Sequence, residues 1–256
     1  MGYSIIVLVK QVPDMNAVRI DRATGQPVLS DQRVISSFDE YAIEEALRIK
    51  EAHGGEVVVV SAGPPSVKDA IQRALGMGAD RGVLLACDHI NDFDTLAVAE
   101  ILANHLRGMT YDIILCGQNS DDYATGHVGP QVAELLGIPH ISSVTKVELD
   151  GQQLTVHRDT EEGKQVVEVG TPVLLMAMTG LNEPRYPSLK GIMAAKKKPI
   201  EQVSVTVPEA GARLRWGEPF VLERGSAGRI LQDVPAAEAA KELVAWLREQ
   251  KLIPTG

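Results

Sequence analysis

Short apolar runs alternate with helix-length segments through the first half of the chain, and this alternation constrains the fold more than any other feature. The run Ile5 to Val9 suits a strand that is buried on both faces. Strands are expected at residues 5–9, 57–61, 82–86 and 113–116, and helices at 37–54, 66–77, 94–106 and 128–136. Strands that alternate with helices of this length predict an α/β protein with a doubly wound, mostly parallel sheet.

The first expected helix carries a start signal and a stop signal. Ser37 is expected at the N-cap, and Glu40 three residues later would complete a capping box. The pair Gly54-Gly55 ends the helix, because glycine accepts the backbone conformation that terminates helices. Phe38 therefore lies at the mouth of a helix, where a large ring has few helical neighbours to cover it.

The pattern changes from Ser142 onward. Asp150-Gly151 and Glu162-Gly163 are hairpin turns, so an antiparallel hairpin extension is expected on the parallel sheet. Its strands are expected at residues 144–149, 154–158, 165–169 and 173–177, followed by an irregular extended segment at 203–221, a linker at 225–231 and a helix at 236–249. We therefore expect an α/β domain over residues 1–225 and a C-terminal arm over 226–256.

Composition excludes several classes of function. The formal charge of −9 and the scarcity of aromatic residues argue against a nucleic-acid partner. Cys87 and Cys116 stand in apolar runs, which indicates buried thiols, and no metal site is expected. The first apolar run is too short for a signal peptide, and no stretch approaches the length of a membrane span. We expect no direct membrane insertion and a cytoplasmic location, or an organelle matrix in a eukaryote.

The loop at residues 117–129, GQNSDDYATGHVG, joins an expected strand to an expected helix. Open parallel sheets bind ligands at such carboxyl ends, and a helix N-terminus with glycine-rich backbone can cradle a phosphate. The loop matches neither a Walker A motif nor a GxGxxG motif, and many glycine-rich loops bind nothing. Asp121 and Asp122 would repel a phosphate, so they fit N-caps or acceptors for ribose hydroxyls. Nucleotide binding is the favoured interpretation.

Catalytic arrangements are poor along the whole sequence. His127 is a lone loop histidine, and no serine and aspartate are spaced to form a nucleophile elbow with it. The paired carboxylates are expected on a solvated helix face (Glu44 and Glu45) or in a turn (Glu161 and Glu162). No catalytic residue is therefore expected.

The segment 179–198 departs from the regular pattern. Leu189, Ile192 and Met193 stand at the spacing of one short amphipathic turn, between prolines and a run of three lysines. Either the segment packs back on its own domain, or it forms a surface anchor for another protein. Spacing alone leaves both interpretations open.

Several motifs add a family resemblance. They are VKQVPD at 9–14, FDE at 38–40 with AIEEA at 42–46, GP at 63–64, ALGMGADRG at 74–82, VHR at 156–158 with Pro172, and LNEPRY at 181–186 with the residues up to Lys198. With these motifs the chain closely resembles the β subunit of electron transfer flavoproteins over nearly its whole length. The resemblance implies a nucleotide α-hydrolase-like fold with a partner-recognition loop and a C-terminal arm that contacts an α subunit.

The resemblance also implies cofactors, partners and site residues. The β subunit would bind a structural AMP, while the α subunit would hold most of a shared FAD. Electrons would pass from acyl-CoA dehydrogenases through the FAD to the electron transfer flavoprotein–quinone oxidoreductase, with no bond chemistry in this chain. The implied AMP contacts are Leu8, Ser36, Ser37, Phe38, Asp39, Ala62, Asp122, Tyr123, Ala124, Thr125, Gly126, His127, Val128, Gly129, Pro130, Gln131, Val132 and Ala133.

Other residues carry the implied flavin and partner contacts. Phe38 matches an aromatic residue that approaches the flavin, and Met15 stands where relatives often have tyrosine. Leu189 matches the leucine that enters a pocket on acyl-CoA dehydrogenases, with Ile192 and Met193 beside it.

Two alternatives remain. Bifurcating relatives bind a second FAD in place of AMP and use NADH as donor; residues 9–13 and 128–130 lean toward that group. The run FDEY at 38–41 and the absence of a Gly-Asp-Thr run at 123–125 favour the AMP-binding carriers. The alternative of another class is a stand-alone nucleotide-binding hydrolase or stress-type module, which the front half alone would suit.

Overall fold

The computed structural model describes residues 2–205, 213–217, 220–221 and 230–254. The chain divides into two compact units, Met1–Pro219 and Phe220–Gly256. The expected domain boundary at residue 225 and most of the expected linker at 225–231 lie outside the described residues, as does part of the expected irregular segment at 203–221.

Within the described residues the first unit is built on one nine-stranded sheet, in the order β11-β10-β9-β12-β8-β1-β6-β7-β13. In this order, every neighbouring pair from β9 through β12, β8, β1, β6 and β7 to β13 is parallel. The pairs β9–β10 and β10–β11 are antiparallel. The strands are β1 (Tyr3–Leu8), β6 (Gly55–Gly63), β7 (Arg81–Ala86), β8 (Ile113–Gly117), β9 (His140–Asp150), β10 (Gln153–Thr160), β11 (Gly163–Gly170), β12 (Val173–Ala177) and β13 (Ile200–Ser204). The predicted α/β class is confirmed, and so is an antiparallel extension made by β9, β10 and β11. The strand expected in that extension at residues 173–177 is placed differently, because β12 pairs parallel with β8 and β9.

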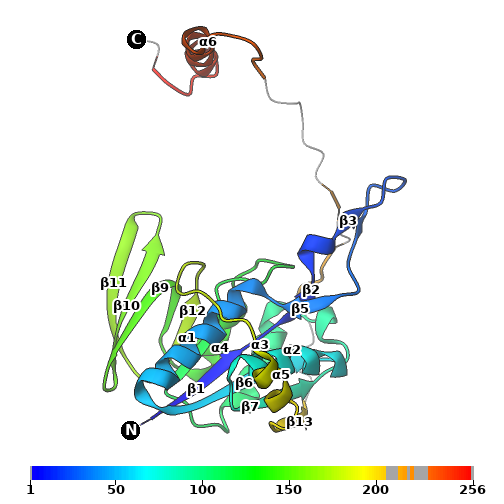
Figure 1. The fold of residues 1–256 in the computed structure, drawn as a ribbon, viewed down its shortest axis with the longest axis vertical. Helices are drawn as coiled ribbons and strands as arrows, with labels where there is room; N and C mark the ends of the chain where they lie inside the picture. Colours follow the sequence, from blue (N-terminus) through cyan, green and yellow to red (C-terminus); the bar gives the residue numbers. More distant parts are fainter. Residues whose placement is uncertain (1, 206–212, 218–219, 222–229, 255–256) are drawn as a thin grey trace. The chain divides into compact units, whose positions relative to one another are not determined.

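Helices cover both faces of this sheet (Figure 1). One face carries α1 (Ser37–His53), α2 (Lys68–Met77) and α5 (Leu189–Ala195), and the other carries α3 (Thr95–Leu106) and α4 (Val128–Leu136). Single helical turns occur at η1 (Met15–Ala17), η2 (Pro65–Val67) and η3 (Ile90–Asp92).

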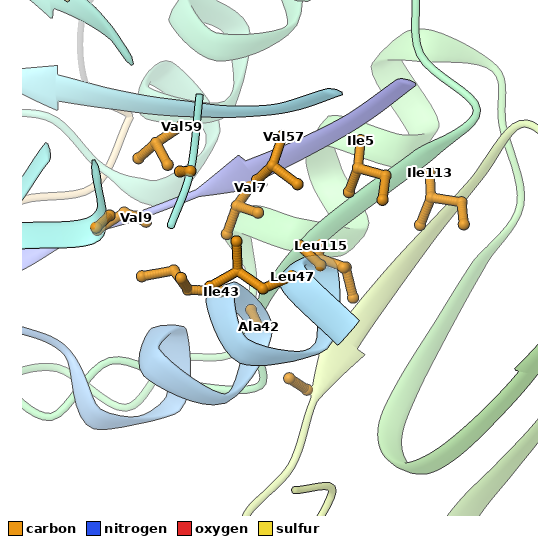
Figure 2. Close-up of a cluster of buried hydrophobic side chains, with 14 of the residues drawn as sticks. Ile5, Val7, Val9, Ala42, Ile43, Leu47, Val57, Val59, Ile113 and Leu115 are labelled. Atoms are coloured by element: carbon orange, nitrogen blue, oxygen red, sulfur yellow. The ribbon is translucent and has the colours of Figure 1, made fainter. Parts of the chain in front are cut away.

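The core follows from the alternation of side chains along the strands. Ile5 and Val7 of β1 point toward α1, where they meet Ile43 and Leu47 (Figure 2). Ile6 and Leu8 point the other way, into the layer with α3 and α4. Both faces of β1 are therefore buried, as its continuous apolar run predicted.

Two small antiparallel ribbons follow β1. β2 (Gln11–Pro13) pairs with β5 (Arg33–Ile35), and β3 (Arg19–Ile20) pairs with β4 (Pro27–Val28).

The predicted capping box at the start of α1 is wrong. Ser36 occupies the N-cap without a side-chain capping bond, and Ser37 is the first helical residue. The backbone N–H and hydroxyl of Ser37 instead donate to Asp121, both at 2.7 Å. Glu40 accepts from Arg73 at 3.0 Å. A carboxylate from a distant loop thus replaces the local cap, which a local motif cannot anticipate.

The second unit contains the predicted C-terminal helix, α6 (Ala236–Glu249). Its apolar side chains, among them Leu243, Val244 and Trp246, are partly exposed in this chain. Across the part of the chain that is described, no helix combines the length and the apolar character needed to cross a membrane.

Candidate functional site

The order in which strands are added to the sheet reverses between β1 and β8. After β1 the chain adds β6 and β7 on one side of β1, and it then adds β8 and β12 on the other side. Such a switch point opens a crevice at the carboxyl ends of the strands. The N-terminus of α1 and the loop 118–127 both lie at this edge, since Asp39 of α1 is hydrogen-bonded to Lys10 after β1 and to Gly117 of β8, and Ser37 to Asp121 of the loop.

Asp39 joins three elements at the crevice. Its Oδ2 accepts from the backbone N–H of Lys10 after β1, and its Oδ1 accepts from the N–H of Gly117 at the end of β8, both at 2.8 Å. Burial raises the pKa of Asp39 to about 7, although the two N–H donors and the Lys10 charge favour the ionised form. A carboxyl that titrates near neutral pH therefore fixes the N-terminus of α1 against the two central strands.

Lys10 provides a cation beside the loop. Its Nζ lies 2.7 Å from Asp122 Oδ2 and 4.6 Å from the centre of the Tyr123 ring. Lys10 thus offsets the negative charge of Asp122, which the sequence had suggested would repel a phosphate.

Two glycines allow close approach of the backbone. A Cβ at Gly117 would stand 2.6 Å from the Cβ of Phe38 and 2.7 Å from Asp39 Oδ1. A Cβ at Gly129 would stand 2.9 Å from Cys116 Sγ. The first turns of α1 and α4 therefore press against the end of β8, and both positions need glycine.

Gln131 provides the test of whether a nucleotide fits. Its side-chain Oε1 is buried in the first turns of α4 and accepts no hydrogen bond. A buried acceptor without a donor is costly, and the amine or hydroxyl groups of a nucleotide would supply one. The residues present are therefore compatible with a ligand that carries hydrogen-bond donors near the start of α4, as a nucleotide does.

The structure brings some of the predicted AMP contacts together and separates others. Ser36 and Ser37 are hydrogen-bonded to Asp121 of the loop 118–127, and Phe38 and Asp39 lie against Gly117 just before it. Val132 and Ala133 are fully buried in the core between α4 and the sheet. The others are placed as follows: Leu8 is buried at the end of β1, Ala62 is half-buried near the end of β6, and Asp122 to Gly126, His127, Val128 and Pro130 line the loop and the start of α4.

Sequence reasoning missed several residues at this site. Lys10 follows the first apolar run, so the sequence predicts its position at the end of a strand. The sequence does not predict its ion pair with Asp122. Gln118 Oε1 accepts from the N–H of Ser143 at 2.6 Å, which ties the loop to β9. Trp216 stacks on Tyr123, and no local pattern signals that contact.

Neither cysteine offers chemistry at the site. Cys87 and Cys116 are both buried, as predicted, and burial holds the pKa of the Cys116 thiol well above its usual range. Within the described ranges, no group of three or more histidine, cysteine or acidic side chains gathers in a way that could hold a metal ion.

The segment 179–198 forms a second candidate site on α5. Leu189 is 83% exposed and Met193 is 72% exposed, and Ile192 is exposed beside them. Ser188 caps the helix by accepting from the N–H of Gly191 at 3.0 Å. The structure therefore presents an apolar surface here instead of folding these side chains inward, and we call Leu189, Ile192 and Met193 the α5 patch.

A charged network holds this segment to α1. Glu44 and Glu45 were expected on a solvated helix face, but both are buried because Arg185 and Asn182 cover them. Arg185 donates to Glu44 through Nε at 2.8 Å and Nη2 at 2.9 Å, and it also pairs with Glu51. The bonds to Glu51 and Glu44 raise the pKa of Arg185, and the bond from Arg185 lowers the pKa of Glu51. Asn182 donates to Glu45 Oε2 at 3.0 Å. The base of the α5 patch is thus fixed by partly buried ion pairs.

Comparisons with known proteins give the family. The model of the electron transfer flavoprotein domain matches residues 28–208. The chain is 39% identical to the electron transfer flavoprotein subunit beta of Clostridium acetobutylicum over 98% of this chain and 100% of that one. It is 46% identical to the subunit of the same name from Thermoanaerobacterium thermosaccharolyticum over 76% of this chain and 75% of that one. It is 33% identical to the caffeyl-CoA reductase-Etf complex subunit CarD of Acetobacterium woodii over 97% and 99%.

The fold and the site define a doubly wound α/β protein whose candidate ligand site lies where the strand order reverses, between β1 and β8. The chain belongs to the electron transfer flavoprotein family, and its similarity is to the β subunits of that family. β subunits of this family are parts of electron carriers that pair with an α subunit, and the family associates with flavin and AMP.

Proposed function

We propose that the chain binds AMP in the crevice and serves as the β subunit of an electron carrier whose α subunit holds most of a shared FAD. The observation that supports this most is the buried, unpaired Oε1 of Gln131 beside the loop 118–127. In this proposal, AMP stabilises the subunit because a ligand that binds only the native state favours folding.

The chain's own residues would bind, shield and orient, and none would react. When bound, FAD supplies the redox chemistry. In this proposal Phe38 at the start of α1 and Met15 in η1 cover the flavin from this subunit's side. The C-terminal unit would contact the α subunit.

The α5 patch would dock the electron donors and acceptors. In this proposal acyl-CoA dehydrogenases bind at Leu189, and the electrons then pass to the electron transfer flavoprotein–quinone oxidoreductase. A small exposed apolar anchor suits a carrier, because a carrier must release each partner quickly. A cytoplasmic location belongs to the same proposal.

The test is the nucleotide content of the co-purified α/β complex. Denaturation, chromatography and mass spectrometry should release one AMP for each FAD. A complex without AMP contradicts the proposed AMP site.

A substitution at Gln131 tests whether the nucleotide lies in the crevice. Gln131→Leu removes the buried acceptor without leaving a cavity, so the fold should persist while AMP is lost. Gln152→Leu, in an exposed turn, is the matched control and should keep its AMP. Equal AMP content in both variants would place the nucleotide elsewhere.

One relative favours a second candidate. The Acetobacterium woodii protein is named as a subunit of a caffeyl-CoA reductase-Etf complex, so in that organism an Etf assembles with a reductase. The second candidate is therefore a bifurcating flavoprotein β subunit, with a second FAD in the crevice and NADH as donor. Two FAD and no AMP in the released nucleotides would select it.

A further inference from the structure

The segment Arg213–Gly217, which we call the strap, is fastened to the start of α3. The backbone N–H groups of Arg213 and Leu214 donate to Asp94 Oδ2 at 2.7 and 3.0 Å. Asp94 also caps α3, because its Oδ1 accepts from the N–H of Ala97 at 2.9 Å. The hydrogen bonds from these backbone N–H groups hold the pKa of Asp94 below its ordinary value. The carboxylate therefore stays charged and keeps the strap bound to the start of α3.

From this anchor the strap reaches the loop 118–127. The Trp216 ring stacks on the Tyr123 ring, with centroids 4.4 Å apart and planes 23° from parallel. Lys10 Nζ lies over the same Tyr123 ring. Tyr123 is therefore held by an aromatic neighbour from the strap and by a cation from the end of β1.

The loop needs such support because its backbone is strained next to Tyr123. Ala124 has φ of 48° and Gly126 has φ of 64°, both in the left-handed region. For alanine this conformation costs about 1 kcal/mol or more, so it persists only when surrounding contacts impose it. Trp216 and Lys10 supply contacts of this kind from outside the loop.

We propose that Trp216 is a positioning residue that keeps the nucleotide-binding loop closed through Tyr123 and thereby slows the release of the bound nucleotide. The inference rests on the proposed function, because it takes the crevice to hold a nucleotide. It adds a residue that lies outside the loop, in a part of the chain far from it in sequence.

The experiment measures nucleotide exchange in the intact α/β complex. Complexes loaded with isotope-labelled AMP are chased with excess unlabelled AMP, and the labelled fraction is followed by mass spectrometry. Trp216→Ala should release label roughly five- to tenfold faster, which corresponds to one aromatic stack. Trp216→Phe should restore slow release because phenylalanine can still stack.

The strap itself offers a matched control. Leu214 is 71% exposed, and its contact with Asp94 uses only the backbone. Leu214→Ala should therefore release AMP at the wild-type rate. Equal rates for Trp216→Ala and wild type would overturn the inference, as would faster release from Leu214→Ala.

Two further measurements cover the remaining outcomes. Tyr123→Ala should speed release. Adding Trp216→Ala to it should cause little further change, because the first substitution has already removed the stack between the two rings. In a Trp246→Phe background, Trp216 fluorescence should change on nucleotide release without any substitution in the strap; constant emission would overturn the inference. A wild-type complex without any nucleotide would instead overturn the proposed function, and this inference with it.

Discussion

Asp39 holds together the ends of β1 and β8 and the start of α1 with a single carboxylate. Its position is enforced by Gly117, since any larger residue there would collide with Asp39 and Phe38. A buried acid that bridges three elements should make the stability of the protein depend on pH.

The direction of this dependence follows from the raised pKa. Burial raises the pKa of Asp39 from 3.8 to about 7, so the native state keeps the proton to higher pH than the unfolded chain does. The contribution of Asp39 to the free energy of unfolding therefore falls as pH rises from about 4 to about 7.

Asp39→Asn removes this titration. We expect the stability of the wild type relative to Asp39→Asn to fall between about pH 4 and pH 7 and to level off above that range. Urea unfolding midpoints of both proteins across this range are the measurement. A difference in stability that stays constant with pH would contradict the expected role of Asp39.

The sequence predicted which kinds of residue the loop 118–127 contributes to the site, but not which distant residues they bond to. Gly117 and Gly129 were recognised only as glycines of a strand-to-helix loop, and the close neighbours that require them appear only in the structure. The bonds from Ser37 to Asp121 and from Lys10 to Asp122 join residues that lie far apart in the sequence. Such tertiary bonds compete with local capping, and only the folded structure decides between them.

At the scale of elements, the pairing of Arg185 with Glu44 holds the base of the α5 patch to α1. The Glu44 side chain is buried, so Arg185→Ala would leave a carboxylate without its cation. We expect this variant to lose about 3 kcal/mol of stability in thermal or urea unfolding.

Arg73→Ala is the control, because it breaks an ion pair of similar length with the more exposed Glu40. We expect a loss of roughly 1 kcal/mol or less. Similar losses in the two variants would mean that burial of Glu44 contributes little.

The α5 patch gives a prediction about partner binding. Leu189 is exposed, so Leu189→Ala should keep the flavin spectrum and the unfolding midpoint of the complex. Loss of an anchor should weaken docking by about 2 kcal/mol and slow reduction by an acyl-CoA dehydrogenase.

The matched control is Val166→Ala, which shortens an exposed apolar residue on β11. Stopped-flow reduction of the flavin should separate the two variants. Unchanged transfer kinetics in Leu189→Ala would remove the anchor role.

Most elements could be predicted, because apolar periodicity and glycine stops are local signals. The strands around β1, the helix α4 with its left-handed Gly137 cap and the hairpin turns of β9–β11 are confirmed. The place of β12 could not be predicted, since a strand of this composition fits either a hairpin or a parallel sheet. All five residues of β12 are buried, and the strand lies between β8 and β9 in the sheet.

At the scale of the whole molecule, the division at Pro219 and Phe220 predicts separate roles for the two units. No described residue of α6 is buried within this chain. Under the proposed function, a chain that ends at Pro219 should therefore keep the far-UV circular dichroism of the first unit and the proposed AMP, but lose its pairing with the α subunit.

Size-exclusion chromatography of the truncated chain co-expressed with its α subunit is the measurement. The full-length chain, co-expressed and purified in the same way, is the control for expression. Retained heterodimer in the truncated sample would show that the first unit alone carries the interface.

The place of β12 in the sheet has a consequence for how the chain is made. When the ribosome has released residues up to 172, β1, β6, β7 and β8 can already pair, but β8 still has an open backbone edge. The hairpins of β9–β11 form from neighbouring sequence, whereas the gap beside β8 closes only when β12 emerges. During that interval of synthesis the nascent chain carries an apolar strand edge in the middle of its future sheet, where a chaperone or a second nascent chain could bind.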